Sequence, residues 1–177
     1  MKETEEYTIG IAEKEQEQKS IQQATSNAQK LRKTYWTSLL TQLEQNSFPL
    51  YRNISPGQDQ GLAAGSGVGG ISYVFIFGKN IMRVELYISR TIPEENKMIF
   101  DGLLQQRETI EAVMGEVLEW QRLDDKKACR IKLKKSVNGF EEANWSEMRD
   151  WHCIHMKNFE SAICDPLASI ARASLGP

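Results

Sequence analysis

The densest group of chemically active side chains in this 177-residue chain is a run of lysines and arginines around position 130. Lys126 and Lys127 precede a segment in which basic and apolar residues alternate, and its basic members are Arg130, Lys132 and Lys134. Because successive side chains of a strand point to opposite faces, these three would share one face. Such a stripe can contact successive phosphates of a nucleic acid.

The same stripe has a second interpretation. An exposed edge strand is often guarded by lysines, which hinder pairing with another chain. The net charge of the chain is -2, which gives no general attraction to nucleic acid and favours the edge-strand interpretation. The candidate nucleic-acid-binding residues are therefore Lys126, Lys127, Arg130, Lys132 and Lys134, with a guarded edge strand as the alternative.

A glycine-rich segment at residues 65–70 has the form GxGxxG. In the dinucleotide-binding fingerprint a strand precedes this loop and a helix follows it, so that phosphate meets the helix N-terminus. Here a β-rich run follows instead. We therefore expect the glycines to serve a tight turn or a close backbone approach, and we expect no cofactor.

Two histidines and two cysteines near the C-terminus could suggest a metal site. His152 and His155 are three residues apart and would share one face of a helix, whereas Cys153 would lie about 100° away from His152. A structural zinc site needs four ligands, and no second pair is present in the sequence. We expect no metal here and histidines that are hydrogen-bonded at the edge of the core.

Other features argue against an enzyme and against a membrane protein. The sequence contains no nucleophile elbow, Walker loop or HExxH motif. No apolar run approaches the ~20 residues of a membrane-spanning helix. The three cysteines, Cys129, Cys153 and Cys164, are typical of reduced thiols in a cytoplasmic protein. We expect a cytoplasmic protein without catalytic residues.

Hydrophobic spacing predicts the helices that would hold these residues. Apolar residues at steps of three and four predict helices over residues 20–45, 93–115 and 145–164. Asp165 and Pro166 should end the last of these and begin a short final helix through Ile170. Residues 1–19 are rich in Glu, Lys and Gln, so we expect a polar lead-in or linker there and a single domain over residues 20–177.

Runs of β-branched and aromatic residues predict the strands. Two hairpins should form, one from residues 71–77 and 81–88 and one from residues 117–123 and 128–134, with a short strand near residues 62–65. The expected order is helix, short strand, hairpin, helix, hairpin, helix. This order predicts an α+β fold in which helices pack on a mainly antiparallel sheet of four or five strands.

Five segments carry a resemblance to a known family: residues 35–40, 65–72, 83–88, 100–107 and 118–131. The most specific are Arg-Val-Glu-Leu-Tyr at 83–87 and Leu-Glu-Trp-Gln-Arg-Leu at 118–123. Over about residues 30–165 the chain resembles a bacterial family of domains of unknown function. Members often look like the C-terminal half of longer proteins whose N-terminal half is similar to PD-(D/E)xK nucleases. The resemblance implies an accessory domain in a DNA-processing or defence setting and supplies no catalytic residues.

The predicted order of elements is also the core order of the PD-(D/E)xK nucleases. Their chemistry needs an Asp on the second strand and Glu-x-Lys on the third, which hold Mg²⁺ and activate the attacking water. Residues 71–77 contain no acid, and Glu85-Leu86-Tyr87 has a tyrosine where the lysine should be. A domain of this type would be catalytically inactive.

We therefore expect a non-enzymatic accessory or binding module that binds nucleic acid or a partner such as a nuclease-like domain. Two alternatives stay open: a degenerate or cryptic PD-(D/E)xK-like metal-dependent nuclease, and a homo-oligomeric assembly domain that pairs through its first helix. A basic sheet face would favour the first function, an acidic cluster the second, and an apolar patch on the first helix the third.

Overall fold

The fold is built on one five-stranded antiparallel sheet with the strand order β1-β2-β3-β5-β4. The computed structural model describes the backbone of residues 2–176 and the side chains of residues 10–176. The strands are β1 (Gly61–Gly65), β2 (Ile71–Phe77), β3 (Ile81–Ile88), β4 (Glu119–Gln121) and β5 (Cys129–Ser136). Both predicted hairpins and the short first strand are present, and the α+β class is confirmed.

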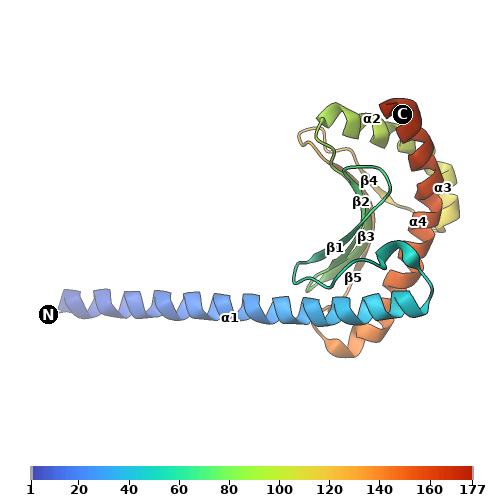
Figure 1. The fold of residues 1–177 in the computed structure, drawn as a ribbon. Coiled ribbons are helices and arrows are strands. Elements are labelled where there is room, and N and C mark those ends of the chain that lie inside the picture. Colours follow the sequence, from blue (N-terminus) through green and yellow to red (C-terminus); the bar gives the residue numbers. More distant parts are fainter. Residues whose placement is uncertain (1, 177) are drawn as a thin grey trace.

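Helices cover one face of this sheet. They are α1 (Lys2–Gln45), α2 (Pro93–Leu104), α3 (Arg107–Met114) and α4 (Trp145–Leu175), with the short 3-10 turns η1 (Pro49–Tyr51) and η2 (Glu142–Asn144). The sheet is curved, and α2, α3 and α4 lie along its convex side (Figure 1). The C-terminal part of α1 packs at one end of the sheet, and the rest of α1 projects past the concave side (Figure 1).

The convex side holds the hydrophobic core. Val84, Leu86 and Ile131 are fully buried there, as the strand alternation predicts. Trp120 is only partly buried, because it lies on the short edge strand β4. Its ring packs edge-on against Phe100 at a centroid distance of 6.1 Å.

The long helix α1 is anchored to the core by aromatic side chains near its C-terminal end. Tyr35 stacks on Phe77 with 4.2 Å between ring centroids, and Trp36 donates a hydrogen bond to the carbonyl of Asp59 at 2.9 Å. The helix begins at Lys2 rather than near Ser20, where the apolar spacing starts. Helical backbone therefore continues well beyond the part that the core stabilises.

Two other helix boundaries differ from those predicted. The segment at 93–115 forms two helices, α2 and α3, because a tight turn in which the Gln106 amide bonds the Leu103 carbonyl lets both Leu103 and Ile110 face the core. The final helix does not stop at Pro166. Residues on both sides, Ile163 and Leu167, are buried, so side-chain packing outweighs the hydrogen bond that proline removes.

The glycine loop joins β1 to β2 and serves a close backbone approach, as expected. Gly67 and Gly70 have positive φ angles of 88° and 78°. A Cβ at Gly70 would lie 2.8 Å from the Cα of Arg90, so only glycine fits there. The Arg90 side chain also reaches into the loop and donates to the Gly69 carbonyl at 2.5 Å.

Candidate nucleic-acid interface

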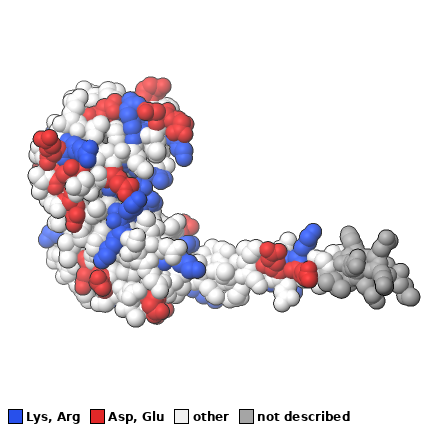
Figure 2. Space-filling model, turned by 180° about the vertical axis from the view of Figure 1, so that it is seen from behind, with Lys and Arg blue, Asp and Glu red and all other residues white. Residues whose placement is uncertain are grey.

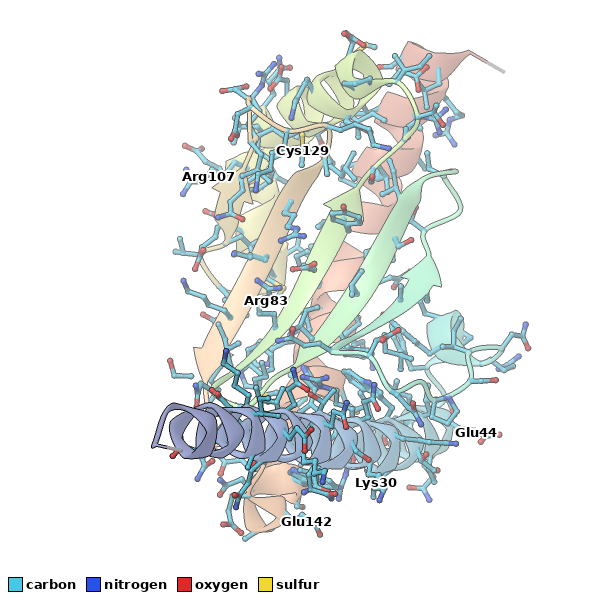
Figure 3. The ribbon with its side chains drawn as sticks, turned by 90° about the vertical axis from the view of Figure 1, so that its left-hand side faces the viewer. Lys30, Glu44, Arg83, Arg107, Cys129 and Glu142 are labelled. Atoms are coloured by element: carbon cyan, nitrogen blue, oxygen red, sulfur yellow. The ribbon has the colours of Figure 1, made fainter. Side chains whose placement is uncertain are left out.

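The concave face of the sheet carries most of the predicted basic residues, and no helix among the described residues packs over it. Antiparallel pairing of β3 with β5 sets Tyr87 opposite Arg130, Glu85 opposite Lys132, and Arg83 opposite Lys134. Glu119 of β4 pairs with Lys132 on the other side. Figure 3 looks onto this face, with Arg83 in its middle, α4 behind the sheet and α1 passing along one end. "Concave face" below means these seven side chains.

The order of the strands corrects the edge-strand interpretation. β5 lies between β3 and β4, so both backbone edges of residues 130–132 are paired, whereas residues 133–136 extend past the three-residue strand β4. Arg130 and Lys132 therefore have no exposed edge to guard, and only Lys134 stands on the part of β5 with one open edge. All three basic side chains belong to the face that no helix among the described residues covers.

Glu85 lies at the centre of the concave face and is only 3% exposed. Its Oε2 is 3.4 Å from the Nε of Arg83, and its Oε1 is 3.9 Å from the Nε of Arg130. These are ion pairs without hydrogen-bond geometry, and Glu85 Oε2, Arg83 Nε and Arg130 Nε are buried without a hydrogen-bond partner. Buried polar atoms of this kind usually have a hydrogen-bond partner. A ligand that bonds these three atoms would therefore gain more binding free energy here than elsewhere on the face.

The two lysines of the stripe share a carboxylate at the rim. Glu119 lies 3.0 Å from the Nζ of Lys134 and 3.8 Å from that of Lys132. Burial, and after it the neighbouring charge of Arg83, lowers the pKa of Lys132 from its ordinary value. Lys134 is half-exposed and free to reach outward, whereas Lys132 is 8% exposed and fixed in the face.

An aromatic ring stands at the end of the stripe nearest Cys129. The guanidinium carbon of Arg130 lies 5.1 Å from the centre of the Tyr87 ring, in a cation–π arrangement. Tyr87 is partly exposed and points to the concave side. The face thus combines guanidinium groups, an ammonium group that can reach outward, and a π surface, which are the groups that contact phosphates and unstacked bases.

The turn between β4 and β5 holds the other two predicted residues, Lys126 and Lys127, and both are exposed. The fully buried side chain of Asn96 ties this turn to α2, because its Nδ2 donates to the carbonyl of Lys127 at 3.0 Å. The ammonium group of Lys97 donates to three carbonyls around the same turn, those of Arg122, Leu123 and Ala128. These hydrogen bonds from α2 therefore hold the turn in place next to the Arg130 end of the stripe.

The geometry gives little support to the cryptic nuclease alternative. The residue of β2 opposite Glu85 is Val74, and Tyr87 occupies the place of the lysine. The other carboxylate of the face, Glu119, is two strands away from Glu85, so their backbones are roughly 10 Å apart and Lys132 lies between them. Within residues 10–176 no three His, Cys, Asp or Glu side chains are placed to hold a metal ion.

Both histidines are hydrogen-bonded, as the sequence predicts, but His152 lies inside the core and not at its edge. His152 is fully buried between Tyr35, whose hydroxyl is 2.7 Å from Nδ1, and the Arg83 carbonyl, 3.1 Å from Nε2. A carbonyl can only accept, so Nε2 carries the proton and Tyr35 donates to Nδ1. Burial lowers the pKa of His152 to about 3, so the ring is neutral at physiological pH. His155 is partly buried and bonds the Trp151 carbonyl at 2.8 Å.

Sequence reasoning missed four of the seven side chains of the site: Arg83, Glu85, Tyr87 and Glu119. Three of them alternate with buried residues along β3, and Arg83 and Glu85 form an ion pair there. The sequence did not indicate that this strand face adjoins the basic stripe, because β3 and β5 are separated by two helices and β4 in the chain. Only the register of the sheet brings them together.

A separate hollow of about 280 Å³ lies between the C-terminal end of α1 and η1. Its wall is mixed: apolar side chains such as Leu40, Phe48 and Ile54 alternate with polar ones, and its charged lining residues are Glu44 and Arg52. The hollow therefore has fewer charged side chains than the concave face.

These features define an α+β domain with one face of its sheet covered by helices and the other open and basic. Residues 31–167 match the family described as Domain of unknown function (DUF4268), and the chain belongs to this family. No curated protein and no solved structure matches the chain. None of the helices among the described residues has the combination of length and apolarity needed to cross a membrane.

Proposed function

We propose that this domain is a non-enzymatic module that binds the phosphate backbone of nucleic acid on its concave face. The observation that carries the proposal is the interior position of β5, which sets Arg130, Lys132 and Lys134 beside Arg83 on an uncovered surface. Four basic side chains there are offset by two acidic ones, Glu85 and Glu119. A local positive surface in a chain of net charge -2 is expected where phosphates are bound.

We infer further that the module is an accessory part of a bacterial DNA-processing or defence protein and that it acts in the cytoplasm. The support for the first point is the family resemblance, since similar proteins often carry a PD-(D/E)xK nuclease-like half. The support for the second is chemical. Cys129, Cys153 and Cys164 are all free thiols, as is usual in a reducing compartment. A nuclease-like partner would cut the nucleic acid that this face holds.

The proposal is tested by fluorescence anisotropy with labelled single- and double-stranded DNA at several salt concentrations. The variant Arg130→Gln/Lys132→Gln/Lys134→Gln should weaken binding to all sequences alike and flatten the salt slope by up to about three units, roughly one per lost phosphate contact. A smaller loss is expected for Lys126→Gln/Lys127→Gln. Circular dichroism and a thermal melt establish that each variant is folded.

The matched control removes three positive charges from exposed positions elsewhere, with Lys30→Gln/Lys33→Gln/Lys157→Gln. It should bind nearly as well as the wild type. Absence of wild-type binding at about 50 mM salt, the low end of the usual range, would refute the proposed function. Equal losses for the face variant and the control would show that net charge, and not the concave face, governs binding.

A further inference from the structure

The projecting part of α1 is the most exposed secondary-structure element among the described residues. The helix has 44 residues, which corresponds to about 66 Å. Every side chain from residue 11 to residue 25 is exposed. A polar helix of this length is marginally stable alone in water and usually gains stability from a packing partner. We call residues 10–25 the arm.

The arm carries two different stripes. Ile11 and Ile21 are large apolar side chains that are 43% and 59% exposed. At about 100° per residue they lie roughly 80° apart around the helix, and Glu13 and Glu17 lie roughly 40° apart. The centres of the two pairs are separated by about a quarter of a turn. The arm can therefore present two isoleucines, with Lys14 between them around the helix, to one surface and an acidic side to another surface at about right angles to it.

The molecule offers such a pair of surfaces. In Figure 1 the arm leaves the body at the open side of the curved sheet, so that the sheet and α1 form the two sides of a corner. Figure 2 shows the same corner from behind, with a band of basic side chains across the body and acidic side chains beside it. One side of the corner is the basic concave face, and the other is an arm with exposed isoleucines. A helix in the corner would meet both.

The arm of the same chain cannot fill this corner. Tyr35, Trp36 and Leu39 are completely buried and fix the direction of α1, and the helix runs without a break from the arm to these anchors. The arm therefore points away from its own concave face. Only a second molecule can bring an acidic, partly apolar helix into the corner.

We propose that the partner is a second copy of this chain, in a two-fold dimer in which the arm of each copy lies in the corner of the other. Glu13 and Glu17 of each arm meet the basic concave face of the other copy. Ile11 and Ile21 pack between the two antiparallel arms. A two-fold arrangement uses both the arm and the face of each copy, and it leaves neither unpaired. The dimer and nucleic acid then compete for the same four basic side chains.

The test measures the molar mass of the whole chain by light scattering during size exclusion, and by sedimentation equilibrium, at about 50 mM and about 500 mM salt. The Debye length falls from roughly 14 Å to roughly 4 Å over this range. A dimer at low salt that dissociates at high salt is expected. Glu13→Lys/Glu17→Lys on the exposed arm should be monomeric at both salt concentrations, because like charges now face each other.

The decisive experiment exchanges the charges of the arm and of the concave face. Arg130→Glu/Lys134→Glu should be monomeric alone, and an equimolar mixture of this variant with Glu13→Lys/Glu17→Lys should form dimers again. The matched control Glu108→Lys/Glu142→Lys reverses two exposed acids on α3 and η2 and should stay dimeric. The arm residues are fully solvated, so their variant decides the outcome even if the face variant folds poorly.

Three results would overturn the proposal: a wild type that is monomeric at low salt, a dimer that survives reversal of the arm charges, or a mixture of two folded variants that fails to associate. None of them bears on nucleic-acid binding, which the anisotropy experiment measures with the face variant. Because the dimer covers the concave face, the proposed function is judged on the monomeric variant Glu13→Lys/Glu17→Lys: if this variant does not bind DNA, the proposed function is refuted and this inference stays intact.

Discussion

The two faces of the one sheet differ in what they do with buried charged groups. On the convex face the buried polar groups are neutral: Tyr35 and His152 share a short hydrogen bond, and the Tyr73 hydroxyl has no hydrogen-bond partner. On the concave face, Glu85 is buried and Arg83 is partly buried, yet Glu85 Oε2 and Arg83 Nε make no hydrogen bond. A fully satisfied network rigidifies a fold, whereas a partly satisfied one keeps its binding capacity for something else. The comparison supports the proposal that the concave face binds a ligand, while the convex face holds the hydrophobic core.

The largest expected effect tests this assignment with two neighbouring residues of β3. Leu86 is fully buried on the convex side, so Leu86→Ala should lower the free energy of unfolding by about 2–5 kcal/mol. Tyr87 is the next residue and faces the concave side. Tyr87→Ala should cost about 1 kcal/mol or less, mainly the contact with Arg130. Urea unfolding of both variants measures the difference. A loss below about 0.5 kcal/mol for Leu86→Ala would contradict its place in the core.

A second prediction uses the pH dependence of the convex face. The folded-state pKa of His152 is about 3, below the ordinary value of 6.5 that applies to the unfolded chain. Between these values the unfolded state binds a proton that the folded state does not, so stability falls as the pH falls through 6.5. From pH 7 to pH 4.5 this one group should remove about 2 kcal/mol.

The measurement is the free energy of unfolding from denaturant titrations between about pH 7 and pH 4.5, a window set by the two pKa values of His152. His152→Gln should be less stable at neutral pH because it loses the Tyr35 contact, but its profile should lack this acid decline. His155→Gln is the matched control on the same helix and should keep the decline of the wild type. Parallel profiles for the wild type and His152→Gln would show that His152 does not control the loss of stability at acid pH.

The smallest expected effect concerns phosphate binding by the concave face. Two variants that each remove one acid should change the affinity in opposite directions. Removing an acid from a basic surface should strengthen phosphate binding by simple attraction, and Glu119→Gln at the rim should do so by about twofold. Glu85→Gln should instead weaken binding by about fivefold, or about 1 kcal/mol. The reason is that Glu85 holds the guanidinium groups of Arg83 and Arg130 in place. If anisotropy titrations show equally stronger binding for both variants, Glu85 acts only as a counter-charge and does not position the two arginines.

Local patterns predicted most of the elements and part of the site. Runs of β-branched and aromatic residues predicted β2 and β3 as a hairpin, and the structure has it. Failures occurred where distant packing decides a local outcome. Pro166 breaks a helix by local rules, but burial of Leu167 against the rest of the core carries α4 through it. The Gln105–Gln106 break between α2 and α3 likewise has no strong local signal.

The sequence by itself determined the fold class, the two hairpins, the role of the glycine loop as a turn, and the five basic residues around position 130. These features depend on contacts within a few residues, on strand alternation and on glycine's access to positive φ. Only the tertiary structure decided that β5 lies beside β3 and not at an edge, which turned a guarded strand into the centre of an open basic face. It also decided that Glu85 is buried among those cations. The pairing of β3 with β5 is selected by packing of the intervening helices on the convex side, and no local pattern of residues encodes it.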